Sequence, residues 1–429
     1  MTTADNIPWQ TVPSDLGDVP FYVIQFDKDG VCTSPAALDH LVETSKSKTD
    51  VFVFSHGWNN DWESATDRYD RFVNEFVAVR RQHWNPPTRE FAPVLAGVFW
   101  PSTALVAPWE RGPDIAADGL ADSDVGALAD VLDPADAARL QAIVADPTLA
   151  GVDDLATLLA PVVAAGIDEV GAGGAAVTKE DLRAVWEEIE STTGLDQPPD
   201  GFIDEGAAAG PPEAAFRFNP IQLIRDGIRA TTVLLMKDRA GRVGGTGVAQ
   251  MLQRLADASA EPRISLAGHS YGAKVMLSAL CNGPAPSRLI DSVLLLQPAL
   301  SCYAFTANLD GRPGGYRPAL DRVRLPIITT RSRHDDPLRK FFHLAVRRKS
   351  DLAEAVIAAE QPPSKFAALG GYGPQGVDAE SIVMPDVGET YPFSTTKRII
   401  AVEGTPFIAS HGGVETPQTA WALLSQVRG

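Results

Sequence analysis

Short apolar runs alternate with longer amphipathic stretches along most of the chain. Several short runs are apolar throughout, which is typical of strands buried on both faces of a parallel sheet. The longer stretches repeat apolar residues at helical spacing. This alternation indicates βαβ units and a doubly wound, mostly parallel α/β sheet. The expected strands are residues 19–26, 51–55, 93–99, 263–267, 292–296, 326–330 and 398–402, and the expected helices are 38–44, 62–82, 247–258, 272–280, 338–347 and 417–427.

The segment 104–215 interrupts this alternation. It is rich in Ala and Asp, has helix-like stretches at residues 127–144 and 179–189, and contains joints of Gly, Ala and Pro. Capping residues precede its periodic runs at Asp133 and Thr178. We therefore expect a helical insertion, and the alternative is a partly disordered acidic linker.

The negative charge of the protein is concentrated in this segment. The whole chain has a net charge of −18, whereas residues 104–215 contain 23 acidic and 4 basic residues. The insertion thus has a net charge of −19, and the two flanking parts, 1–103 and 216–429, have +1 together. Such an acidic segment repels nucleic acid and anionic membranes, so neither is an expected partner.

The composition points to a cytoplasmic protein. Hydrophobic residues make up 45% of the chain, enough for a large core. The longest apolar segment, residues 155–167, is too short to span a bilayer and contains Pro161, and residues 1–6 lack the features of a signal peptide. Neither a disulfide framework nor a zinc site is indicated by the three scattered cysteines, Cys32, Cys281 and Cys302.

The strongest chemical signal is a Gly-x-Ser-x-Gly motif. An apolar strand, residues 263–267, runs into Gly268-His269-Ser270-Tyr271-Gly272, and an Ala/Leu-rich helix follows at once. The two glycines permit a sharp strand-to-helix turn that exposes the Ser270 hydroxyl. An ordinary glycine turn is the alternative, but the strand before the motif and the helix after it favour a nucleophile.

Together with two further motifs, this elbow resembles the α/β-hydrolase superfamily, and within it the bacterial esterase-like hydrolases. The expected strand 51–55 ends in His56-Gly57-Trp58-Asn59-Asn60, and a later strand ends in Phe99-Trp100-Pro101-Ser102. The resemblance covers about residues 19–103 and 216–429 and leaves the insertion unexplained. It implies an α/β-hydrolase fold for a core formed by residues 1–103 and 216–429.

The resemblance assigns His56-Gly57-Trp58 to the oxyanion loop. The backbone N–H groups of Trp58 and Tyr271 would then hold the oxygen of a tetrahedral intermediate. Asn59 is the alternative donor. His56 and Gly57 would otherwise only form a tight turn.

The same resemblance implies the chain order serine, acid, histidine, which leaves three candidate bases. His334 lies on the expected acid loop and His343 within an expected helix. His411 lies between the last strand and the last helix, where the histidine of this superfamily lies. The alternative is a structural loop histidine.

The acid is expected just after the strand 326–330. Asp335 is the first choice because Leu338, three residues later, matches the Asp-x-x-apolar pattern of the superfamily. Asp336 is the alternative, or Asp336 and Pro337 simply begin a helix. A metal site formed by His334, Asp335 and Asp336 lacks a second ligand cluster, so no metal is expected.

A triad of Ser270, His411 and Asp335 implies an enzyme that cleaves a carboxylic ester of a small molecule through an acyl-enzyme, without a cofactor. Amide or thioester hydrolysis, acyl transfer and a non-catalytic binding protein are the alternatives. The insertion 104–215 follows a core strand that ends near Ser102, so we expect it to act as a lid or cap over Ser270. An oligomerisation or partner-binding surface is the alternative.

Overall fold

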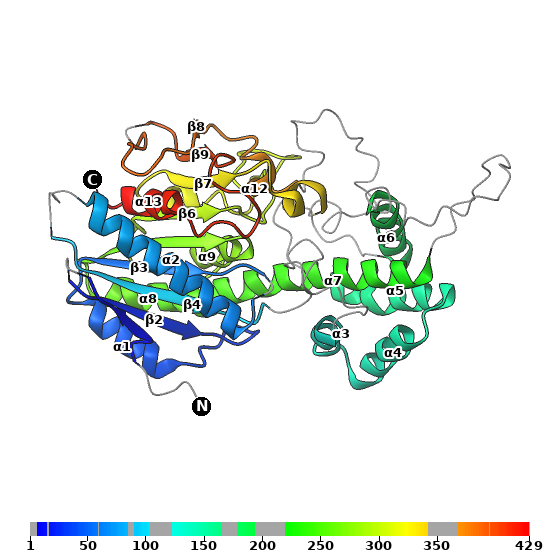
Figure 1. The fold of residues 1–429 in the computed structure, drawn as a ribbon. Helices are drawn as coiled ribbons and strands as arrows, with labels where there is room; N and C mark the ends of the chain where they lie inside the picture. The colour runs from blue at the N-terminus through cyan, green and yellow to red at the C-terminus, as the bar shows by residue number, and fades with distance from the viewer. Residues whose placement is uncertain are drawn as a thin grey trace, which may run out of the picture.

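The computed structural model describes residues 7–14, 17–58, 60–84, 90–102, 122–164, 178–193, 219–341, 367–393 and 395–428 of the 429-residue chain. Its centre is a nine-stranded sheet with the strand order β1-β2-β4-β3-β5-β6-β7-β9-β8 (Figure 1). Among the strand pairs, only β1 and β2 are antiparallel. The predicted α/β class with a mostly parallel sheet is confirmed. The strands are β1 Gln10–Val12, β2 Val19–Gln25, β3 Asp50–Ser55, β4 Pro93–Phe99, β5 Arg263–His269, β6 Ser292–Leu296, β7 Ile327–Arg331, β8 Glu380–Val383 and β9 Ile399–Glu403.

The central strands are apolar throughout because helices cover both faces of the sheet. In β3, Val51 and Val53 join one hydrophobic cluster, while Phe52 and Phe54 join the cluster on the opposite face. Successive side chains of a strand point to opposite faces, so a continuous apolar run feeds both clusters. One face packs against α1 Pro35–Ser45, α7 Pro220–Val243, α8 Ala249–Ala258 and α9 Tyr271–Cys281, and the other packs against α2 Trp62–His83 and α13 Pro417–Ser425 (Figure 1).

Several elements were not expected from the sequence, among them two edge strands and the long helix α7. The strands β1 and β8 lie at the two edges of the sheet and are short and partly exposed, so neither has an apolar run. Helix α7 buries several charged side chains among its apolar ones, which hides its periodicity; Asp226, Lys237 and Arg239 are buried.

Two expected helices differ in the structure. The stretch 127–144 is two helices, because α3 Asp122–Ala129 ends and the Asp133 side chain caps a new helix, α4 Pro134–Ala145. The stretch 338–347 begins with a π-helical turn, η2 Pro337–Phe341, and its later residues lie outside the described ones.

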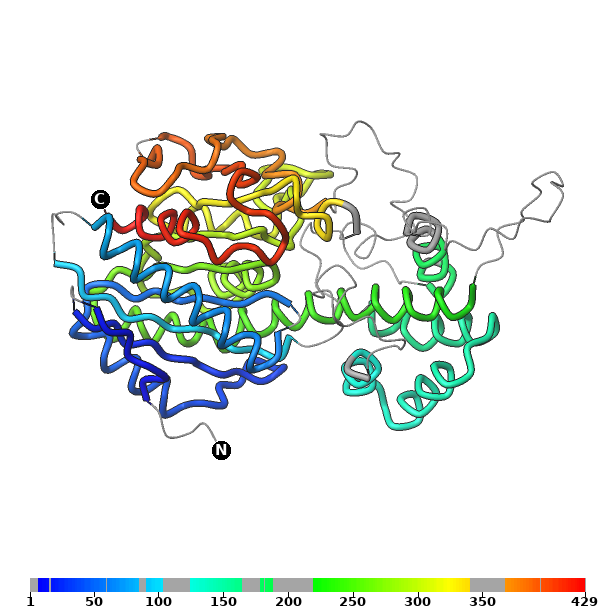
Figure 2. The backbone as a smooth tube through the Cα atoms, viewed as in Figure 1, coloured from blue at the N-terminus to red at the C-terminus, as the bar shows by residue number. Residues whose placement is uncertain are grey.

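Helices α3 to α6 form a separate helical lobe with the first half of α7. The remaining two are α5 Leu149–Ala164 and α6 Lys179–Thr193. Their apolar side chains make a third hydrophobic cluster, which includes the fully buried Trp186. The Trp186 indole packs directly on α7 at Gly227, where an added Cβ would lie 2.8 Å from the ring. Helix α7 extends out of the sheet layer and connects this lobe to the core (Figures 1 and 2).

Across the described residues, no helix combines the length and the apolar character needed to cross a membrane.

Candidate active site

The Gly-x-Ser-x-Gly motif forms a tight turn between β5 and α9. Ser270 lies between the two elements with φ 55° and ψ −122°, a backbone conformation that non-glycine residues rarely adopt. Its backbone is fixed by the β6 strand end, because the Ser270 N–H donates to the Leu296 carbonyl at 3.0 Å. Holding a serine in this conformation costs about 1–3 kcal/mol, and strain of this kind is concentrated at functional sites.

Both motif glycines lie where no side chain fits. A Cβ at Gly272 would be 2.1 Å from the Ser55 carbonyl oxygen of β3, and a Cβ at Gly268 would be 2.5 Å from the Gly272 carbonyl oxygen. Gly57 approaches the serine in the same way, since its added Cβ would lie 2.7 Å from the Ser270 Cβ. The loop after β3 therefore touches the serine directly.

Three residues from distant parts of the chain form a hydrogen-bonded series. The Ser270 hydroxyl lies 2.9 Å from His411 Nε2, and His411 Nδ1 lies 2.8 Å from Asp335 Oδ2. A proton on Nδ1 faces the carboxylate, which leaves Nε2 as the acceptor for the serine hydroxyl. The structure thus brings together Ser270, His411 and Asp335 in the geometry of a nucleophile, a base and an orienting acid.

The Asp335 carboxylate is fully buried and held by two further donors. Its Oδ2 accepts a hydrogen bond from Gln297 Nε2 at 2.8 Å, and its Oδ1 accepts one from the Leu338 N–H at 3.0 Å. Three donors in all fix the orientation of the carboxylate toward His411. The neighbouring Asp336 does not occupy this position, because it is exposed and lines the pocket outside the triad.

The loop 56–60 is held by a buried asparagine. Asn60 Nδ2 donates to the carbonyl oxygens of Gly57 at 3.2 Å and Trp58 at 2.9 Å. Ser102, on the loop after β4, closes the turn by accepting from the Asn60 N–H at 3.1 Å. Trp58 lies beside Tyr271, with ring centroids 6.4 Å apart, so the two expected oxyanion donors come from neighbouring residues. Asn59, the alternative donor, lies outside the described residues.

His56 supports this loop as a neutral side chain. Its ring stacks on Trp100 with centroids 5.5 Å apart, and its Nε2 accepts a hydrogen bond from the Trp100 N–H at 3.3 Å. Its Nδ1 then carries the proton and donates to the Gly57 carbonyl at 2.8 Å. Burial lowers the pKa of His56 to about 4, so it stays uncharged at neutral pH.

Two side-chain donors hold the His411 loop. His269 Nε2 donates to the His411 carbonyl oxygen at 2.8 Å, and Arg68 of α2 donates to the Gly412 carbonyl oxygen at 3.1 Å. Arg68 also forms an ion pair with Glu415 at 2.6 Å. Burial of His269, together with the nearby His411 and Arg68, lowers its pKa well below the usual value. His269 is therefore a neutral donor to the backbone of the base.

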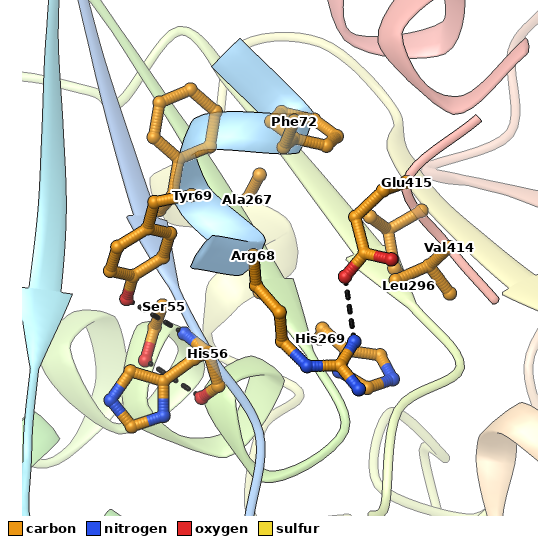
Figure 3. A pocket seen from close by; sticks show the side chains of 12 residues that line it. Ser55, His56, Arg68, Tyr69, Phe72, Ala267, His269, Leu296, Val414 and Glu415 are labelled. Atoms are coloured by element: carbon orange, nitrogen blue, oxygen red, sulfur yellow. Dashed lines mark hydrogen bonds and ion pairs between the residues drawn. The ribbon is translucent and has the colours of Figure 1, made fainter. Parts of the chain in front are cut away.

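Two cavities flank this arrangement. A small one of about 50 Å³ is lined by Arg68 and Glu415, which form an ion pair there (Figure 3). A larger one of about 730 Å³ reaches the reacting atoms, since Ser270 and His411 both line it. Its described lining residues are Trp58, Asn60, Ser64, Asp67, Arg68, Arg71, His269, Ser270, His334, Asp336, Pro337, Ser410, His411, Gly412, Gly413 and Glu415. None of these comes from the described part of the helical lobe.

The other candidate bases are not in the series. His334 is exposed and lines the larger cavity, and His343 lies outside the described residues. Sequence reasoning missed the supporting residues Gln297, Asn60 and Arg68. Of these three, only Gln297 could have been found from the sequence, because it is a polar residue at the end of the apolar strand β6.

A comparison of the chain with protein-family models, with curated proteins and with solved structures finds no match. The function is therefore inferred from the geometry of this site.

Proposed function

We propose that the chain is a serine hydrolase of the α/β-hydrolase fold that cleaves a carboxylic ester. The observation that supports this most directly is the hydrogen-bonded series from Ser270 through His411 to Asp335, with Ser270 at a strained elbow. The strand order and the site at the carboxyl ends of β5, β7 and β9 are compatible with that fold.

The proposed reaction begins with attack of the Ser270 oxygen on the ester carbonyl. His411 Nε2 takes the serine proton during the attack, and Asp335 stabilises the imidazolium that forms. The N–H groups of Trp58 and Tyr271 hold the oxyanion, and the N-terminus of α9 adds a favourable dipole.

The intermediate then collapses to an acyl-enzyme. His411 donates its proton to the leaving alcohol as the carbon–oxygen bond breaks. A water molecule, deprotonated by the same histidine, attacks the acyl group, and the second collapse releases the acid and restores the Ser270 hydroxyl. Every step uses the side chains of the site and water.

A fluorophosphonate probe tests the proposal. The wild type should be labelled on Ser270, identified by peptide mass spectrometry, and should hydrolyse nitrophenyl acetate. Ser270→Ala should lose both properties, whereas Ser47→Ala, a change at an exposed serine after α1, should keep both. Absence of labelling in a folded wild type would contradict the proposal.

A second set of assays identifies which bond is cleaved and which molecule accepts the acyl group. Matched ester, thioester and anilide substrates measure which bond is cleaved, and added alcohols measure acyl transfer. We expect the ester to have the highest kcat/KM and water to be the acceptor.

A further inference from the structure

Part of the lining of the larger cavity consists of polar residues of helix α2. Ser64, Asp67, Arg68 and Arg71 all line it, and their spacing of three, four and seven residues places them on one face of the helix. The opposite face of α2 is buried and mainly apolar, packed against the sheet through Tyr69, Phe72, Val73 and Phe76. We call the four cavity-lining residues the α2 polar face.

The rest of the described lining is also polar. The acid loop contributes His334 and Asp336, and the His411 loop contributes Ser410, Glu415 and two glycines. Trp58 and Pro337 are the only large apolar residues in the described lining. Among the residues that the structure describes, the space next to the nucleophile is thus lined mainly by hydrogen-bonding and charged groups.

Two charged side chains of the α2 polar face are open to a ligand. Arg68 is engaged by Glu415 and the Gly412 carbonyl. Asp67 and Arg71 are exposed and, within the part of the chain that the structure describes, form no ion pair with each other or with another residue. They are one turn apart, so the cavity that Ser270 lines also presents one open anion and one open cation.

Such a lining disfavours fatty acyl groups. An alkyl chain placed here displaces water from charged groups without replacing their hydrogen bonds, which is unfavourable. In an apolar channel, by contrast, each added CH₂ group increases binding about fourfold. A hydroxyl, amide or charged substituent replaces the displaced water and keeps the lining groups hydrogen-bonded.

We infer that the substrate is a short, hydrophilic ester, whose polar substituents contact the α2 polar face through Asp67 and Arg71. This inference rests on the proposed function of Ser270 and adds the substrate class to it. These two side chains line the same cavity as Ser270 and His411, and their charges select the substituents.

The test uses the full-length protein and nitrophenyl esters below their aggregation concentrations. From acetate to octanoate, kcat/KM should stay level or fall. Nitrophenyl 6-hydroxyhexanoate and nitrophenyl heptanoate have chains of equal length but end in a hydroxyl or a methyl group. The hydroxy ester should be preferred by up to about tenfold, the equivalent of one hydrogen bond.

The double variant Asp67→Leu/Arg71→Leu should reverse this preference in favour of heptanoate. Leucine is a good helix former, so the exposed helix face should tolerate it. Asn74→Leu, an exposed position one turn later that does not line the cavity, is the matched control and should keep the wild-type ratio.

A wild-type kcat/KM that rises with chain length, or a ratio unchanged in the double variant, would overturn the inference. Failure of the proposed function is distinguishable, because then neither probe labelling of Ser270 nor hydrolysis of any ester is observed.

Discussion

The carboxyl edge of the sheet and the helical lobe are stabilised in different ways. At the sheet edge, close backbone approaches at Gly57 and Gly272 and a series of buried hydrogen bonds fix each atom of the site. In the lobe, four helices pack apolar side chains around Trp186 on one end of α7. Hydrogen bonds are directional and apolar packing is not, so the edge should tolerate almost no change, whereas the lobe should tolerate many.

The largest expected effect is at the sheet edge. Asp335→Asn keeps the size of the side chain but disfavours the tautomer in which His411 Nε2 accepts from Ser270. We expect kcat to fall about 10⁴-fold. Thermal unfolding and hydrogen exchange in the helical lobe should be unchanged. A kcat within tenfold of wild type would remove Asp335 from the triad.

A substitution in the core of the lobe should lower the stability of the lobe and leave the labelling of Ser270 intact. Trp186→Ala removes the largest side chain of its core and should cost the lobe about 3–5 kcal/mol of local stability. Hydrogen exchange should accelerate in α5 and α6, while the probe still labels Ser270. Val131→Ala, at an exposed lobe position, is the control and should have little effect. Loss of labelling in the Trp186 variant would show that the two regions are coupled, as a lid requires.

Mild acid should also affect the two regions differently, by destabilising the sheet edge more than the helical lobe. His56 has a folded-state pKa of about 4, below the value of about 6.5 in an unfolded chain, so between these pH values only the unfolded state takes up the proton. The stabilisation is complete above pH 6.5 and is lost as the pH falls toward 4, by about 3 kcal/mol. The lowered pKa of His269 likewise makes the folded state less stable as the pH falls. Residues 104–243 contain no histidine. Protection factors, which correct hydrogen-exchange rates for their intrinsic pH dependence, should therefore fall from pH 7 to pH 5 by more in β3 and β5 than in α5, and an equal fall would contradict this.

The smallest expected effect concerns the support of the base. His269→Ala removes the donor to the His411 carbonyl and should lower kcat about tenfold, with little change in KM. His269→Gln can still present a donor and should recover part of the loss. Equal kcat values for the alanine variant and the wild type would show that the His411 loop is held sufficiently by Arg68.

Much of this site could be predicted from the sequence because its motifs are local. The strand, the two glycines and the helix around Ser270 are contiguous in the chain. The conformation of each can be predicted from its own residues. The partner of His411 was harder to predict, since Asp335 and Asp336 are adjacent and only the spacing to Leu338 favoured Asp335. Arg68 could not be predicted as a support, because it acts on Gly412, which lies 344 residues further along the chain and comes close only on folding.

The sequence by itself determined the alternation of strands and helices, the parallel sheet and the strand-to-helix turn at Ser270, because these depend on local periodicity and on backbone freedom at glycine. The tertiary structure alone decided the partners. It placed the buried carboxylate of Asp335 at His411, brought the α2 polar face to the same cavity as Ser270, and packed helices α3 to α6 with the first half of α7 into one apolar cluster. Contacts between residues far apart in the chain depend on register and packing, which no local pattern encodes.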